Sequence, residues 1–169
     1  GRTTEEAVQR LLDGVPWDRA GTPAPAAGNG SAMRAAPVGL VYRNDIAELA
    51  RVAHDQGRIT HADPRCSAGA VAVAAAVAFA AAGDRPDAAR WAPSIADLAE
   101  PHDAPFAEAI RQLEDFVDLP PEDAAAMISR LGWEPETHIS QEGIAPFVVP
   151  SVLWSLYSVF RNPEDYWAT

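Results

Sequence analysis

Two glycines flank an asparagine at Gly28, Asn29 and Gly30, immediately before a stretch whose composition favours a helix. Glycines adopt backbone angles that other residues disfavour, and they expose backbone N–H groups to a ligand. If a helix begins at residue 29 or 30 and runs toward Leu40, its free N–H groups and its dipole point at the glycines, which is an arrangement that binds phosphate. Because Asn-Gly pairs also form ordinary turns, a phosphate loop and a bare turn are both open interpretations.

A histidine lies close to a second predicted helix start. His61 stands two residues before Asp63, a favourable N-cap residue that is followed by Pro64 at the first helical position. A histidine at this place can hydrogen-bond a phosphate or a sugar hydroxyl, and the helix dipole would disfavour its positive form. The alternative interpretation is a structural histidine.

The other reactive side chains lack partners at a useful spacing. His54, His102 and His138 have no neighbours at metal-ligand spacing, so we interpret them as surface or structural residues. Cys66 is the single cysteine, which excludes an internal disulfide. It falls in the first turn of the helix after Asp63, but nothing resembles a cysteine-hydrolase signature, and we expect it to be buried. Acidic pairs lie at helix starts or solvent faces and receive no catalytic role.

Helices are expected to position all these residues, because strand-like alternation is almost absent. Capping residues, terminal glycines and apolar spacing predict helices over residues 3–14, 44–57, 63–83, 103–117, 120–132 and 144–160. The predicted caps are a capping box formed by Thr3 and Glu6, then Asn44, Asp63 and the aspartate of "DAP" at Asp103, and the polar segments 83–87 and 134–142 are predicted to be ordinary connections. The third of these has no polar side from residue 68 to 82, so it should be central and buried. The fold class is therefore all-α, and residues 1–169 form a single domain.

Composition argues against several classes of protein. The net charge is −11 and the 13 basic residues form no cluster along the chain, so we expect no nucleic-acid partner. The longest apolar stretch, from Ala68 to Gly83, is shorter than the roughly 20 residues that span a bilayer. We identify no signal peptide. The expectation is a soluble, cytoplasmic protein without a membrane partner.

Taken together, these segments resemble a known family. "GNGSAMRAAPVGL" from Gly28, followed by "ITHADPRCSAGAVAVAAAVA" from Ile59, closely resembles the ADP-ribosylglycohydrolases, which include dinitrogenase reductase-activating glycohydrolase. "GIAPFVVPSVLWSLYSVFRNPEDYWAT" is similar to that family's apolar helix and the start of the next. The resemblance is strongest over residues 28–82 and 143–169, and it implies an all-α orthogonal helical bundle.

The resemblance also implies a site. Family members bind ADP-ribose beside two divalent cations, Mg²⁺ or Mn²⁺, and hydrolyse the N- or O-glycosidic bond to a modified side chain or small acceptor. The expected partner is an ADP-ribosylated protein or an ADP-ribose derivative. By the family pattern, the glycine loop, residues 28–30, would wrap the diphosphate and the distal ribose, and His61 would face the ligand. The substrate-binding residues would be Gly28, Asn29, Gly30, Ser31, Met33 and His61.

The sequence departs from the family pattern at the metals. A Thr-Asp-Asp-Thr-like motif and a Gly-Gly-Asp-Thr-Asp-Thr-like motif hold the family's cations, and neither occurs in these 169 residues. We therefore expect the metal ligands outside this chain, and we assign no catalytic or metal-ligating residue within it. The alternative function is a non-catalytic ADP-ribose-binding relative, or a structural, crystallin-like relative, of the same fold.

The two ends of the chain favour an internal portion of a longer protein. Asn162 has the character of an N-cap, and the sequence stops soon after it; a frayed native terminus is the alternative. The missing N- and C-terminal segments would then be partners of this piece. Without these segments, we expect an apolar face to be left partly exposed to solvent. It is formed by Trp154, Leu156, Tyr157 and Phe160.

Overall fold

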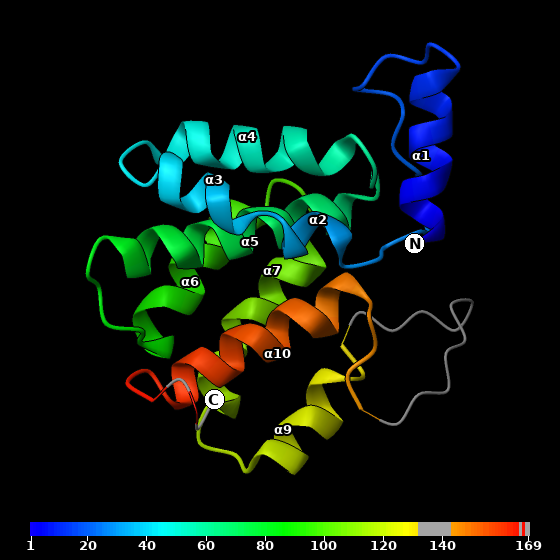
Figure 1. Cartoon of the computed structure of the whole chain (residues 1–169). Helices are drawn as coiled ribbons and strands as arrows, with labels where there is room; N and C mark the ends of the chain where they lie inside the picture. The colour runs from blue at the N-terminus through cyan, green and yellow to red at the C-terminus, as the bar shows by residue number, and fades with distance from the viewer. Residues whose placement is uncertain (132–142, 166, 168–169) are drawn as a thin grey trace.

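The computed structural model describes residues 1–131, 143–165 and 167, and this part of the chain is all-α (Figure 1). It contains no sheet, only two isolated backbone bridges. The prediction of an all-α fold is therefore confirmed. The helices are α1 (Arg2–Leu12), α2 (Gly30–Met33), α3 (Ala36–Val41), α4 (Ile46–Arg58), α5 (Pro64–Ala81), α6 (Ala88–Ala99), α7 (Ala104–Arg111), α8 (Leu113–Phe116), α9 (Pro121–Ile128) and α10 (Val148–Arg161).

The alanine-rich helix α5 lies at the centre of the bundle, as predicted. It packs against α2, α3, α4, α6, α7 and α10. Small side chains allow these close approaches: at Gly69, an added Cβ would collide with Val148 of α10. By length and composition alone α5 is apolar enough to cross a membrane, but most of it is buried inside the protein, as expected for a core helix.

The other helices surround α5 on different sides. In Figure 1, α3 and α4 lie along one side of α5, α10 crosses the bundle on another, and α1 stands apart at one end beside the start of α2. The loop after α1 holds that helix to the body. Arg10 of α1 donates a hydrogen bond of 2.6 Å to the carbonyl of Ala20 in the loop, and Arg58 of α4 donates one of 2.7 Å to the carbonyl of Asp18 in the same loop. The N-terminal segment is thereby brought close to the glycines at residues 28–30.

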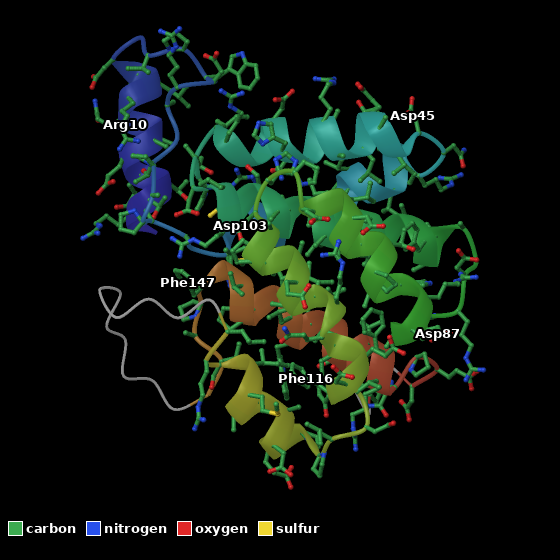
Figure 2. All side chains as sticks on the ribbon, turned by 180° about the vertical axis from the view of Figure 1, so that it is seen from behind. Arg10, Asp45, Asp87, Asp103, Phe116 and Phe147 are labelled. Carbon is green, nitrogen blue, oxygen red and sulfur yellow. The ribbon has the colours of Figure 1, made fainter. Side chains whose placement is uncertain are left out.

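Aspartate side chains begin four of the helices. The carboxylates of Asp63 and Asp103 accept hydrogen bonds from backbone N–H groups at the starts of α5 and α7, as predicted. Asp45 and Asp87 do the same for α4 and α6; Figure 2 labels all but Asp63. The sequence predicted Asn44 as the cap of α4, which is wrong by one residue.

Several predicted helix boundaries are also wrong. No side-chain capping bond begins α1, so the capping box expected at its start is not formed. The helix expected to run to Leu40 divides into α2 and α3, because Pro37 has no N–H to donate to the carbonyl of Met33. The helix expected over residues 103–117 likewise divides, into α7 and α8. The predicted end of α9 at Gly132, and His138, lie outside the described residues.

One helix, α6, was not predicted at all. Pro93 lies inside it and obscured the apolar pattern, although Trp91 and Ile95 on its inner face are buried. Asp87, which caps α6, falls in the segment 83–87 that was predicted to be a connection. The unpredicted helix supplies much of the core on one side of α5.

The last helix differs from expectation in two ways. It begins at Val148 rather than Ile144, since Phe147 is extended and pairs with Gly28. Asn162 ends α10, and residues 163–165 are not helical; the rest of the helix expected after Asn162 lies mostly outside the described residues. The predicted exposed face is also wrong: Leu156, Tyr157 and Phe160 are buried, and Trp154, half-buried, stacks on the Tyr157 ring.

Candidate functional site

Two backbone bridges bring the glycine loop to its place. At one, Thr22 accepts a hydrogen bond of 2.8 Å from the N–H of Ala62, beside His61. At the other, the N–H of Val148 donates to the carbonyl of Ala27 at 2.9 Å. The long loop between α1 and α2 is therefore attached both to the α4–α5 connection and to the start of α10. This attachment places Gly28 next to His61, which is far from it in sequence.

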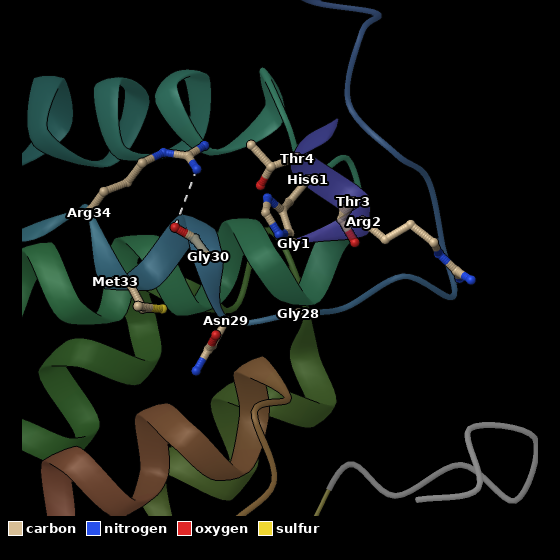
Figure 3. A pocket seen from close by; sticks show the side chains of 10 residues that line it. All are labelled: Gly1, Arg2, Thr3, Thr4, Gly28, Asn29, Gly30, Met33, Arg34 and His61. Atoms are coloured by element: carbon tan, nitrogen blue, oxygen red, sulfur yellow. Dashed lines mark hydrogen bonds between the residues drawn. The ribbon is translucent and has the colours of Figure 1, made fainter. Parts of the chain in front are cut away.

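A pocket of about 550 Å³ opens at this point (Figure 3). Five of the six predicted substrate-binding residues line it, and Ser31 does not. Sequence reasoning missed the other lining residues, because no local pattern shows that α1 and the side chain after Met33 reach the same place. The lining consists of Gly1, Arg2, Thr3, Thr4, Gly28, Asn29, Gly30, Met33, Arg34 and His61.

The glycines are needed for a close approach, not for unusual backbone angles. A Cβ added at Gly30 would lie 2.7 Å from Cε1 and 3.0 Å from Nε2 of His61, closer than side chains pack. One added at Gly28 would lie 3.5 Å from Nε2, an ordinary contact. Neither glycine has a positive φ. The backbone-angle argument is therefore wrong at these positions, and the imidazole packs directly against the loop.

The expected helix dipoles contribute less than the sequence suggested. Helix α2 is a single turn of four residues, so few peptide dipoles align behind the glycines. The start of α5 already holds a carboxylate, since Asp63 accepts hydrogen bonds from the backbone N–H of Arg65 at 3.0 Å and from its Nε at 2.9 Å. The start of α5 is therefore occupied by its own predicted cap, Asp63.

Charge in the pocket nevertheless favours an anion. The chain as a whole carries a net charge of −11, yet no aspartate or glutamate is among the described residues that line the pocket. Two arginines, Arg2 and Arg34, are among them. Arg2 also pairs with Glu6 at 3.4 Å, so the positive charge that can attract a negatively charged ligand comes mainly from Arg34.

The surroundings of His61 favour its neutral form. Its side chain is buried, and Nδ1 lies 2.7 Å from Oγ1 of Thr60. Burial first, and the nearby charge of Arg34 second, lower the pKa of His61 below its usual value. The sequence correctly predicted that the positively charged form of His61 is disfavoured. The causes are burial and the charge of Arg34 rather than the dipole of α5.

Three further predicted residues have different surroundings. Asn29 donates from Nδ2 to Oγ of Ser151 on α10 at 3.1 Å, which fixes the loop to that helix. Met33 is 76% exposed at the pocket edge. Ser31 is fully buried and donates its hydroxyl to the carbonyl of Cys66 at 2.9 Å. Its hydroxyl is therefore used to join α2 to α5, and Ser31 is not among the residues that line the pocket.

The remaining candidate groups are structural in their contacts. Cys66 is buried, and burial first, then the charge of Asp63, raise its pKa to about 12, which agrees with the predicted packing role. His54 and His102 stack with their ring centroids 4.9 Å apart. Within residues 1–131 and 143–165, no group of three or more histidine, cysteine or acidic side chains is placed to hold a metal ion.

Comparison with known proteins agrees with the resemblance in the motifs. The sequence profile of the family described as ADP-ribosylglycohydrolase matches residues 1–169. An uncharacterized protein of Archaeoglobus fulgidus is 41% identical over 78 residues. That match covers 46% of this chain and 25% of the relative, so the matched segment spans only a quarter of that protein's length. With the profile matching over its whole length, the chain belongs to the ADP-ribosylglycohydrolase family.

Proposed function

We propose that the protein containing this chain hydrolyses the N- or O-glycosidic bond that joins ADP-ribose to a modified protein side chain or a small acceptor. Family membership supports a glycohydrolase that acts on ADP-ribosylated substrates. The observation that carries the proposal is the shared pocket: the glycine loop and His61 come from separate motifs and line one cavity. Its arginines, Arg34 above all, and the lack of acidic side chains in its described lining suit a diphosphate.

In this proposal the loop at Gly28, Asn29 and Gly30 lies along the diphosphate and distal ribose. His61, as a neutral ring, donates a hydrogen bond to a phosphate or sugar oxygen. The thioether of Met33, exposed at the edge, covers an apolar face of the ligand. Ser31 contributes indirectly, by holding α2 against α5.

The family generally depends on divalent cations, which supply Lewis-acid activation of the substrate or of a water molecule. The described residues do not fit such a centre, because no carboxylate lines the pocket and no cluster of metal-binding side chains occurs among them. We therefore assign the ligands of Mg²⁺ or Mn²⁺ to other segments of the same protein. Residence in the cytoplasm is likewise part of the proposal.

A second candidate function is a relative that binds ADP-ribose, or serves as a structural protein, without catalysis. The absence of acidic side chains from the described pocket lining favours it. A hydrolysis assay distinguishes the enzyme from the non-catalytic relative. The protein, with the segments that flank it in its gene, is incubated with ADP-ribosylated arginine and serine peptides with and without EDTA. Release that EDTA abolishes supports the enzyme; binding without release from any acceptor supports the second function.

The site assignment is tested separately by titration calorimetry with ADP-ribose. Asn29→Ala and His61→Ala should each weaken binding about tenfold, since each removes a polar group from the pocket. Asn44→Ala is the matched control, because Asn44 is exposed and lies outside the pocket lining. Unchanged affinity in both pocket variants would refute the assignment even if the protein proved to be a hydrolase.

A further inference from the structure

Arg34 reaches His61 through an intervening hydroxyl. Arg34 follows α2, and one of its terminal nitrogens donates to Oγ1 of Thr60 at 2.7 Å and to the carbonyl of Gln56 at 2.8 Å. The same Thr60 oxygen lies 2.7 Å from Nδ1 of His61. Arg34, Thr60 and His61 thus form one chain of hydrogen bonds that ends in the pocket. Figure 3 labels its two ends, Arg34 and His61.

The direction of each bond follows from what the groups can do. A guanidinium only donates, so Oγ1 of Thr60 must accept from Arg34. The threonine proton is then free to donate, and among the described contacts the one acceptor within reach is Nδ1 of His61. A neutral imidazole carries one proton, so if Nδ1 accepts, the proton must sit on Nε2. That nitrogen lies against Gly28 and Gly30, where the loop has no side chains.

We propose that Arg34 and Thr60 are positioning residues that hold His61 as the neutral Nε2–H tautomer and present this N–H to the pocket ligand. The identity of the ligand rests on the proposed function, but the tautomer does not. The free N–H suits an oxygen that only accepts, such as a phosphate oxygen, or the oxygen of a sugar hydroxyl. Arg34 therefore acts on the ligand through a second residue as well as through its own charge.

The same chain opposes protonation of the ring. In a charged imidazole both nitrogens donate, so Thr60 would have to accept from His61 and Arg34 together and turn its own proton away. Burial first, and the nearby Arg34 charge second, also disfavour the charged ring and lower the pKa of His61. A neutral ring with a defined N–H is thus the arrangement that satisfies all three groups.

The test is the nitrogen chemical shifts of His61 in the ¹⁵N-labelled full chain, which distinguish the two tautomers without any ligand. We expect the Nε2–H form in the wild-type protein and in Thr60→Ser, which keeps the hydroxyl. In Thr60→Val, a substitution of similar shape, the two tautomers should mix. Arg34→Met should raise the pKa of His61, since it removes a neighbouring charge. An Nδ1–H ring in the wild type, or in Thr60→Ser, would overturn the proposal.

Calorimetry with ADP-ribose then tests the consequence for binding. Thr60→Val should lower the affinity about three- to tenfold, the loss expected for one hydrogen bond, while Thr60→Ser should stay close to the wild type. Wild-type affinity in Thr60→Val would overturn the positioning role. If wild-type His61 proves to be the Nε2–H tautomer and the protein binds no ADP-ribose, the proposed function fails, and the hydrogen-bond chain itself stands.

Discussion

Replacing Gly30 by alanine tests the central contact of the site, the packing of the His61 ring against the glycine loop. The new methyl group would lie 2.7 Å from Cε1 and 3.0 Å from Nε2 of His61. The ring has little freedom to move, because it is buried and hydrogen-bonded to Thr60 at 2.7 Å. Gly30→Ala should therefore displace the ring, and Gly28→Ala, whose methyl group would lie 3.5 Å from Nε2, should not.

The magnitude follows from two opposing effects. Overpacking a close contact costs about 1–3 kcal/mol. Alanine in place of glycine at the start of α2 gains up to about 1 kcal/mol of helix propensity. The free energy of unfolding should thus fall by about 1–2 kcal/mol, which lowers the melting temperature by about 2–8 °C for a chain of this size. Gly28→Ala should stay within about 0.5 kcal/mol of the wild type.

Thermal unfolding followed by circular dichroism measures both variants beside the wild type, and ADP-ribose titration of each follows. Gly30→Ala should also bind ADP-ribose more weakly than Gly28→Ala, because the displaced ring of His61 no longer points its Nε2–H at the ligand. If Gly30→Ala melted with the wild type and bound ADP-ribose equally well, the close approach of the ring would not be what requires glycine at position 30.

Three further changes test other parts of the structure. Burial is the main cause that lowers the pKa values of His54 and His102 below 6.5 in the folded protein. Below pH 6.5 the unfolded chain therefore binds more protons than the folded protein. The free energy of unfolding should keep its full value above that pH and decline as the pH falls. Melting temperatures at about pH 7.5 and 5.5 should show this decline, and His102→Asn should reduce it. The thiol of Cys66, with a pKa of about 12, should resist iodoacetamide at about pH 8 until the protein unfolds; rapid labelling of native protein in a mass-spectrometric time course would contradict its burial. Asp63→Asn removes the carboxylate charge that lies 2.7 Å from Arg65, and urea titration should show a loss of about 3 kcal/mol, whereas a loss below about 1 kcal/mol would mean that the pair contributes little.

Local physics explains what could be predicted at the level of the fold. An aspartate cap satisfies N–H groups two or three residues ahead, so Asp63 and Asp103 were identified correctly from sequence. The apolar run in α5 has no polar face, which predicts a buried helix without any knowledge of its neighbours. Helix α6 was not predicted, because Pro93 interrupts the apolar spacing of its sequence. Only its packing against the core reveals it.

The candidate site divides in the same way between sequence and structure. The residue types at Gly28–Gly30 and His61 were sufficient to select the two motifs, because glycine and histidine have chemistry that few other residues share. The sequence could not show that the imidazole itself occupies the space left by Gly30, nor that Ser31 turns to Cys66. Contacts of this kind join separate helices, so they exist only once the bundle has packed.

The sequence by itself therefore determined the helical class, the buried central helix and the residues at which a ligand should be sought. Tertiary structure alone decided the route from Arg34 through Thr60 to His61, and with it which ring nitrogen faces the pocket. The physical reason is the distance along the chain over which each interaction acts. Capping and periodicity act within a few positions of the chain, whereas the donors and acceptors around a buried ring come from whichever segments the folded backbone brings together.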